Sequence, residues 1–230
     1  MKDIVHELKQ KIAEIERRIG EYGLSTLTGG NVSALDPERK LVVITPSGLN
    51  KRTLTPDDMV VLNMNGDIIE GKHKPSIESV MHLAIYKEIS RAKAIIHAHP
   101  PMVTTLSIVG KGIPPITEEL IEFAVEQGVP VSRYACTGSI DLAKEVINLL
   151  KISDAVIMQN HGIVVIAPDL ESAFNKLFAI EFVAGRYVYA SILGKPRTLT
   201  LDEIKRVVET IDKWSNLKIV KNIYKDWLRK

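Results

Sequence analysis

Short segments rich in β-branched residues alternate with amphipathic segments along this chain, and that alternation limits the folds open to it. The first kind predicts strands over 41–45, 59–64, 67–69, 94–99, 154–159 and 163–167. Asn65-Gly66 separates two of these strands and is typical of a hairpin with a type I′ turn, because both residues accept positive φ angles. Such hairpin signals exclude a purely parallel sheet and predict a mixed α/β chain with antiparallel pairing.

The amphipathic segments predict helices over 2–19, 76–89, 102–109, 117–127, 139–151 and 169–193. Ser76 is placed as a helix cap, and the stretch 24–33 is polar and glycine-bearing. The segment 169–193 is long and largely apolar, so we expect it to be buried or to form a subunit contact. Thr200 and Glu203 form a capping box that opens a helical tail. Without repeats or composition shifts, we expect a single domain over 1–230, with 196–230 as the tail.

The net charge and the single cysteine limit the partners and the cellular location that we expect for this protein. The 30 Lys and Arg residues nearly balance the 28 Asp and Glu residues, giving a net charge of +2. This balance gives no sign of a nucleic-acid partner, although a small anionic ligand stays compatible with it. One cysteine, Cys136, excludes an intrachain disulfide and favours a cytoplasmic location. We expect neither a signal peptide, because the first residues are charged throughout, nor a membrane span.

Two histidines stand two residues apart at the end of a predicted strand. His97 and His99 should project from the same face at a backbone separation of about 7 Å, because strand side chains alternate. One metal ion can bridge that span, but two half-exposed imidazoles are the alternative. A catalytic zinc takes three protein ligands, and His161, between two predicted strands, is suitably placed for the third.

The remaining histidines favour structural roles. His6 lies on a charged helix and His73 in a basic loop, while His82 follows Glu78 by one helical turn and can pair with it. Glu78 itself begins a predicted helix, where acidic residues are common. A zinc ligand and a general base are the two functional alternatives for this carboxylate.

Three turns combine glycine or proline with small polar residues: Thr28-Gly29-Gly30-Asn31, Pro46-Ser47-Gly48 and Pro75-Ser76. Backbone amides and small hydroxyl groups in such turns can hold a phosphate, although each turn alone is equally compatible with an ordinary loop. The usual phosphate loops and the serine-hydrolase elbow are absent from the sequence.

These pieces, in this order, resemble the class II aldolase/adducin family and, within it, the fuculose-phosphate aldolase branch. The resemblance runs from about residue 5 to about residue 195 and rests on the segments 28–33, 44–48, 75–78, 97–99 and 159–162. It implies a three-layer α/β/α sandwich around a largely antiparallel central sheet. It also implies a homotetramer with sites near the subunit interfaces.

The resemblance implies a role for each motif residue. His97, His99 and His161 would hold a zinc ion, and Glu78 would be both a displaceable fourth ligand and the catalytic base. The phosphate of a sugar substrate would lie among Gly30, Asn31, Ser47, Gly48, Ser76 and Ile77. Many members have a second serine where this chain has Ile77, so one hydroxyl donor is missing, although the Ile77 amide remains. Manganese or cobalt is an alternative to zinc, because imidazole and carboxylate suit several divalent ions.

The implied reaction is the reversible cleavage of a ketose 1-phosphate into dihydroxyacetone phosphate and an aldehyde such as lactaldehyde. The aldolases of this branch supply a tyrosine as proton donor from a neighbouring subunit, whereas the matching position here holds Glu118; Tyr224 in the tail is a second candidate. Related 4-epimerases typically carry Asp at the position of Glu78, and adducin-like members lack the full histidine set. A 4-epimerase, a sugar-phosphate dehydratase and a non-catalytic module are the alternatives.

Overall fold

A seven-stranded sheet forms the centre of the molecule, with strand order β4-β3-β2-β1-β5-β7-β6. We obtained a computed structural model of the chain; it describes residues 4–36, 38, 40–123, 125 and 127–215. Every strand pair in the described sheet is antiparallel. The strands are β1 (Asn31–Asp36), β2 (Leu41–Ile44), β3 (Val60–Asn63), β4 (Ile68–Glu70), β5 (Ala94–Ala98), β6 (Ala155–Met158) and β7 (Gly162–Ala167).

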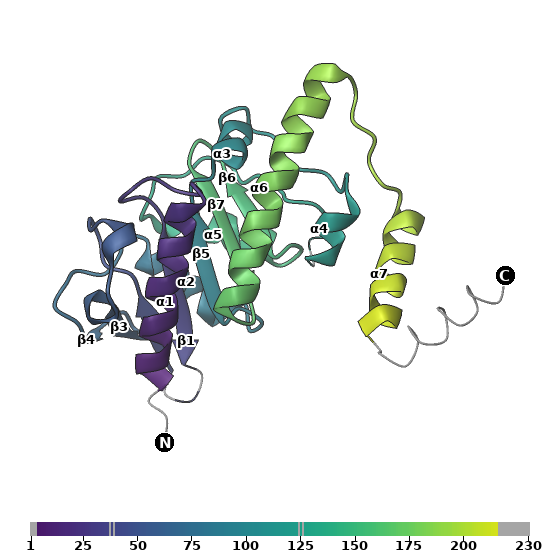
Figure 1. The fold of residues 1–230 in the computed structure, drawn as a ribbon. Coiled ribbons are helices and arrows are strands. Elements are labelled where there is room, and N and C mark those ends of the chain that lie inside the picture. Colours follow the sequence, from purple (N-terminus) through teal and green to yellow (C-terminus); the bar gives the residue numbers. More distant parts are fainter. Residues whose placement is uncertain (1–3, 37, 39, 124, 126, 216–230) are drawn as a thin grey trace.

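Helices cover both faces of this sheet and produce three layers (Figure 1). On one face, α1 and α6 pack with α3 and α4 over a core that includes Ile12, Ile96 and Leu177. On the other face, α2 and α5 bury Ile85, Val146 and Ile166. The predicted three-layer α/β/α sandwich with an antiparallel sheet is confirmed. The helices are α1 (Ile4–Glu21), α2 (Ser79–Glu88), α3 (Pro101–Ile108), α4 (Glu118–Glu122), α5 (Ile140–Leu150), α6 (Leu170–Leu193) and α7 (Leu201–Ser215), with short 3-10 turns η1 (Lys51–Thr53) and η2 (Pro56–Asp58).

The C-terminal part of the described chain lies to one side of the sandwich. Helix α6 extends beyond the sheet, and α7 stands apart from the body and contacts α4 (Figure 1). The projecting end of α6 exposes Tyr189, Ile192 and Leu193. Exposure of such large apolar side chains to water is energetically unfavourable. This end of α6 is therefore a surface suited to burial against another chain.

Strand β1 is an element that the sequence pattern does not predict. It occupies the middle of the sheet between β2 and β5, although it carries the polar residues Asn31, Ser33 and Asp36. These residues are buried; Ser33 bonds to His82, and the Asn31 side-chain nitrogen donates to Glu78, whereas Oδ1 of Asn31 has no hydrogen-bond partner among the described residues. Local alternation of polar and apolar residues cannot reveal such a strand, because tertiary partners replace water.

Three local predictions need correction. Helix α2 begins at Ser79 with Glu78 at its N-cap, three residues later than expected, so Ser76 is not the cap. Helix α4 ends at Glu122, well before 127. The β3–β4 hairpin is confirmed, but its turn is not type I′, since Asn65 has a negative φ. The Asn63 side chain instead accepts hydrogen bonds from the amides of Asn65 and Asp67.

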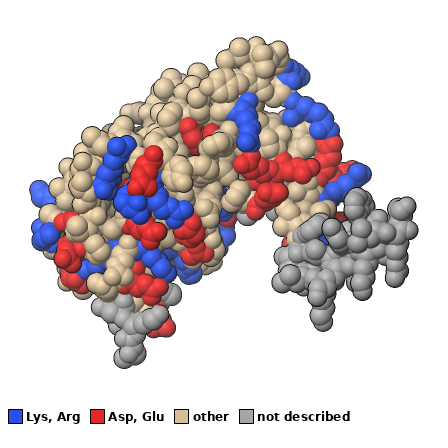
Figure 2. Space-filling model, in the orientation of Figure 1, with Lys and Arg blue, Asp and Glu red and all other residues tan. Residues whose placement is uncertain are grey.

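Surface charge is mixed on the face that Figure 2 shows, where basic and acidic side chains lie interspersed over α1 and near α7. Within the described part of the chain, no helix combines the length and the apolar character that crossing a bilayer requires.

Candidate active site

Three histidine side chains from separate parts of the chain converge at one edge of the sheet. His97 lies in β5, His99 follows this strand directly, and His161 lies in the turn between β6 and β7. One nitrogen atom of each ring lies within 4.8 Å of the others. The Nε2 atoms of His97 and His99 are 3.0 Å apart. The strand alternation that predicts a shared face for His97 and His99 is therefore observed.

Backbone geometry brings His161 to this pair. Antiparallel pairing of β5 with β7 sets Ala98 opposite Ile163, so the turn before β7 reaches the end of β5. Asn160 adopts a left-handed conformation with φ of 57° in this turn, which asparagine tolerates better than most residues. A Cβ atom on Gly162 would lie 2.4 Å from the carbonyl oxygen of Ala98 and 2.6 Å from the His99 ring. Glycine at this position therefore permits the close approach of the two segments.

The carboxylate of Glu78 faces the three imidazoles. Its Oε2 atom lies 3.0 Å from Nε2 of His97, and its Oε1 atom lies 3.7 Å from Nε2 of His161. Asn31 donates a hydrogen bond to Oε2 at 2.9 Å, and Thr137 donates one to Oε1 at 3.0 Å. Both carboxylate oxygens are thus held, and Glu78 makes no side-chain cap for α2.

The electrostatics of the cluster favour neutral His99 and His161 rings beside an ionised Glu78 carboxylate. Burial alone would raise the pKa of Glu78, but His97, Asn31 and His161 together hold it well below the usual range for a carboxyl group. Burial and the neighbouring His97 lower the pKa of His99 to about 3, and burial also lowers the pKa of His161. Neutral imidazole and ionised carboxylate are the forms that bind a divalent metal.

The donor set fits a divalent metal ion. His97 directs Nδ1 to the carbonyl oxygen of Ile163 at 2.9 Å, which leaves Nε2 facing the other ligands. Metal-binding histidines commonly have such a partner on the second nitrogen, because it fixes the tautomer and the ring orientation. Three imidazoles and a carboxylate suit zinc and several neighbouring divalent ions.

The residues predicted to hold a phosphate line the same cavity as these four side chains. This cavity measures about 170 Å³ and is lined by Gly30, Asn31, Ser47, Gly48, Ser76, Ile77, Glu78, His97, His99 and His161, together with Thr28, Gly29, Pro46, Lys51 and Thr137. The structure therefore brings together all ten residues of the predicted metal, base and phosphate sites. Thr137 and Lys51 are two lining residues that the sequence analysis did not single out.

Backbone pairing positions two of the turns that are predicted to hold a phosphate, 46–48 and 75–76, which are called the phosphate turns below. Pro46 and Pro75 form an isolated antiparallel bridge in which the amides of Ser47 and Ser76 bond to Lys74 and Thr45. Those two amides are therefore committed, whereas the amides of Gly48 and Ile77 have no hydrogen-bond partner among the described residues. Ile77 also lies directly before Glu78, the N-cap residue of α2, where the positive end of a helix dipole favours an anion.

Behind the site, a buried network ties β1 to α2. The Ser33 hydroxyl bonds to Nδ1 of His82 at 2.7 Å and to the Tyr86 hydroxyl at 2.8 Å. Burial lowers the pKa of His82 to about 3, so this ring is neutral. His82 thus binds Ser33 and does not form the side-chain pair with Glu78 that the helical spacing suggests.

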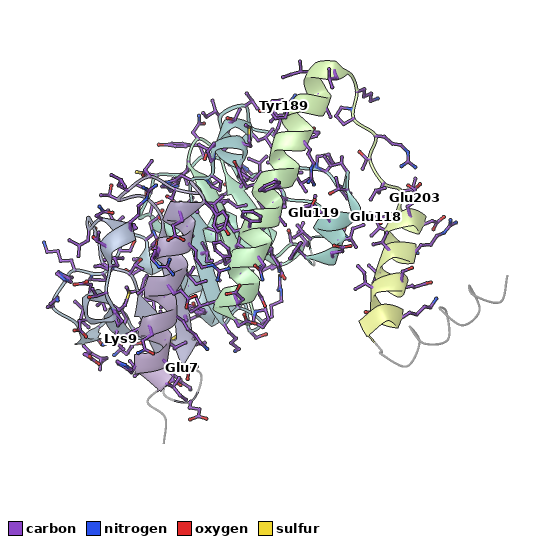
Figure 3. All side chains as sticks on the ribbon, viewed as in Figure 1. Glu7, Lys9, Glu118, Glu119, Tyr189 and Glu203 are labelled. Carbon is purple, nitrogen blue, oxygen red and sulfur yellow. The ribbon has the colours of Figure 1, made fainter. Side chains whose placement is uncertain are left out.

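Of the two predicted proton donors, Glu118 does not join the cluster. Glu118 lies on α4 and lines a separate cavity with Arg197, Glu203 and Arg206 from the region of α7 (Figure 3). Tyr224 lies outside the described residues. Both stay predictions that depend on a neighbouring subunit.

Fold and site together define a three-layer α/β/α protein in which three converging histidines, Glu78 and the glycine- and serine-bearing turns line one cavity. The family model described as "Class II Aldolase and Adducin N-terminal domain" matches residues 10–188. The chain belongs to this family, as the sequence motifs indicate. Divalent metal dependence is a property of the class II aldolases, and the convergent histidines agree with it.

Particular relatives narrow the comparison. A 5-deoxy-D-ribulose 1-phosphate aldolase of Bacillus thuringiensis serovar kurstaki is 32% identical over 209 residues, which are 91% of this chain and 97% of the relative. An L-ribulose-5-phosphate 4-epimerase of Salmonella paratyphi B is 41% identical over 110 residues, 48% of each protein. A solved structure of L-fuculose 1-phosphate aldolase superposes with a TM-score of 0.85 at 32% identity, covering 90% of this chain and 96% of that one.

Proposed function

We propose that this protein is a divalent-metal-dependent aldolase that reversibly cleaves a ketose 1-phosphate into dihydroxyacetone phosphate and a short aldehyde. The aldolases that it resembles are named for 5-deoxy-D-ribulose 1-phosphate and L-fuculose 1-phosphate. Their aldehyde products would be acetaldehyde and lactaldehyde respectively, since three carbons leave as dihydroxyacetone phosphate. Zinc is the metal that we expect.

One observation supports the proposal more than any other: the Glu78 carboxylate lies between the three imidazoles and the phosphate turns. Reversible cleavage next to a ketone needs a positive centre for the carbonyl oxygen, a group that carries a proton to and from the adjacent carbon, and an anchor for the phosphate. His97, His99 and His161 would hold the metal, Glu78 is the base, and the turns at Ser47 and Ser76 are the anchor. When bound, the metal supplies a Lewis acid that polarises the carbonyl group and stabilises developing negative charge.

Glu78 performs the proton transfer in this proposal. In the direction of synthesis, one of its carboxylate oxygens removes a proton from the hydroxyl-bearing carbon of dihydroxyacetone phosphate, and in cleavage it returns that proton to the same carbon. Asn31 and Thr137 hold the carboxylate in one orientation. The amides of Gly48 and Ile77 and the hydroxyls of Ser47 and Ser76 fix the phosphate, which places the reacting carbon beside Glu78. A carboxylate is a weak base, so proton removal by Glu78 would depend on a metal held by His97, His99 and His161.

The aldehyde end needs a second proton carrier. During synthesis the aldehyde oxygen gains a proton as the carbon–carbon bond forms. Glu118 and Tyr224 are the candidates, each contributed by a neighbouring subunit of a homotetramer. The exposed apolar end of α6 agrees with such an assembly, because Ile192 and Leu193 are 76% and 89% exposed in the single chain.

A 4-epimerase acting on a pentulose 5-phosphate is the second candidate. About half of the chain is 41% identical to such an enzyme. Glu78 argues for the aldolase, since the epimerases of this family typically have Asp at this position.

A cytoplasmic location stays a prediction.

Product analysis separates these functions. The zinc-loaded protein is incubated with L-fuculose 1-phosphate, 5-deoxy-D-ribulose 1-phosphate and L-ribulose 5-phosphate, and dihydroxyacetone phosphate and pentulose epimers are measured. We expect dihydroxyacetone phosphate from a ketose 1-phosphate, loss of its formation after chelation, and recovery with zinc. Epimerisation without cleavage would replace the proposal with the second candidate.

Glu78→Gln tests the base. The variant keeps the three imidazoles, so it should retain metal while kcat falls by about 10²–10⁴-fold, the usual contribution of general acid–base catalysis. A metal-loaded variant with less than a tenfold loss would remove Glu78 from this role.

A further inference from the structure

Lys51 is a buried cation beside the phosphate turns. Its side chain is only 4% exposed, and its Nζ atom donates a hydrogen bond to the carbonyl oxygen of Pro46 at 2.9 Å. Its own amide bonds to the carbonyl of Leu27 at 2.8 Å. Lys51 thus connects the turn at 46–48 with the loop that precedes β1, and these two segments form one wall of the cavity.

The cavity has one basic side chain in its lining, although burial lowers the pKa of Lys51 and only Glu16 acts to raise it. Among its lining residues, Lys51 is the only lysine or arginine; the others are neutral, apart from Glu78 and the three histidines. A sugar phosphate brings a charge of about −1.5 to −2 at pH 7. Neutral hydroxyl and amide donors orient a phosphate, but they do not neutralise it, and in the proposed function the three histidines would hold the metal at the carbonyl group of the substrate. A phosphate at Ser47 and Gly48 therefore has one source of positive charge in this wall.

A purely structural ion pair explains Lys51 poorly. Its partner Glu16, from α1, is 1% exposed, but Nζ and Oε1 are 4.0 Å apart, which is too long for a hydrogen bond. The Oε1 atom of Glu16 has no hydrogen-bond partner in the structure. Burying two charges costs several kcal/mol per ion unless close geometry offsets it, and this pair is loose. Burial also raises the pKa of Glu16 to about 7, so near neutrality this carboxyl is only partly ionised and compensates Lys51 incompletely.

We propose that Lys51 supplies the countercharge for the substrate's phosphate group, and that it thereby makes the site selective for phosphorylated over free ketoses. This inference rests on the proposed function, because it takes a sugar phosphate as the substrate. It adds a charged residue to a phosphate site otherwise made of glycine, serine, asparagine and backbone amides.

Inorganic phosphate and a pair of variants test the assignment without turnover. Lys51→Met alone would leave the buried Glu16 carboxyl without a cationic partner. The comparison therefore uses Glu16→Gln and the double variant Glu16→Gln/Lys51→Met, which removes both charges together. Lys74→Met is the matched control, since Lys74 is an exposed neighbour whose side chain does not line the cavity. The dissociation constant for phosphate is measured by thermal shift on the zinc-loaded full chain.

We expect phosphate to stabilise the wild type, Lys74→Met and Glu16→Gln, and to bind the double variant at least tenfold more weakly than Glu16→Gln. In turnover, KM for the ketose 1-phosphate should rise by at least tenfold between these two variants, with kcat within about threefold. A phosphate affinity of the double variant within twofold of Glu16→Gln, or no phosphate binding by the wild type, would overturn the inference. Lys51-dependent phosphate binding without cleavage of any ketose phosphate would instead reject only the proposed aldolase activity.

Discussion

Glu78 occupies a helix N-cap position, yet its carboxylate does not cap the helix. Asn31, Thr137 and His97 hold the side chain away from the first amides of α2. A carboxylate at an N-cap would ordinarily stabilise the helix by accepting a hydrogen bond, a contribution of about 1 kcal/mol. At this residue the contacts serve the site instead of the helix, which is the pattern expected where function and local stability compete.

Thr137→Val tests how much the fixed orientation of the Glu78 carboxylate contributes to the proposed turnover. Valine keeps the shape of threonine but removes the hydrogen bond to Oε1 of Glu78. We expect kcat to fall about tenfold, equivalent to about 1.4 kcal/mol, with the metal content unchanged. Thr105→Val is the control, because the Thr105 hydroxyl bonds only to the carbonyl of Pro101 on the surface of α3. Equal kcat values for the two variants would show that Thr137 does not position the base.

Glu16 should make stability depend on pH. Burial raises its folded-state pKa from 4.5 to about 7, so its contribution to stability is fully present below pH 4.5 and is lost as the pH rises to 7. The difference in unfolding free energy between wild type and Glu16→Gln should therefore shift against the wild type by roughly 2–3 kcal/mol over that interval. Urea unfolding at pH 4.5, 5.5 and 7 measures this shift. A constant difference would contradict a raised pKa at Glu16.

At the scale of the element, the turn between β6 and β7 has little room. Gly162→Ala would place a methyl group against the Ala98 carbonyl and the His99 ring, so the two segments must separate. We expect a stability loss of about 1–3 kcal/mol, as for other overpacked sites, and at least tenfold weaker zinc binding. Gly194→Ala has open space at its Cβ position and should change neither quantity. Competition with a zinc indicator, combined with thermal unfolding, gives both values.

Sequence patterns predict most of the elements but not the whole site. Periodicity identifies helices such as α1 and α5, and β-branched content identifies β2 and β7. The buried residues of these elements are mostly apolar, so the sequence pattern alone shows which positions face the core. Strand β1 escapes detection, since the buried Ser33 depends on His82 and Tyr86 from another element. The pairing of His97 with His99 follows from strand alternation, whereas the approach of His161 required the family resemblance. Thr137 and Lys51 carry no local signal at all.

At the scale of the whole molecule, the described chain exposes an apolar helix end, and the predicted donor Glu118 lies outside its own site. We expect a solution mass near four times the 25.6 kDa of the chain, measured by light scattering after size exclusion. Ile192→Glu should dissociate the assembly and abolish turnover while zinc binding persists, because the metal residues belong to one chain. A fully active monomer would exclude a donor from a neighbouring subunit. Ser191→Glu is a nearby control for added charge.

The antiparallel register that sets Asn31 opposite His97 has a consequence for how such a protein diversifies. This pairing holds Asn31, which we propose to bind the phosphate, against His97, which we propose to bind the metal, and a slip of a single residue would turn both side chains to the wrong face. If the proposed function holds, a related protein would acquire a new aldehyde through parts outside this strand pair, such as the segment around Thr137 or a neighbouring subunit. The sheet would preserve the reaction, and the surrounding segments would determine the substrate.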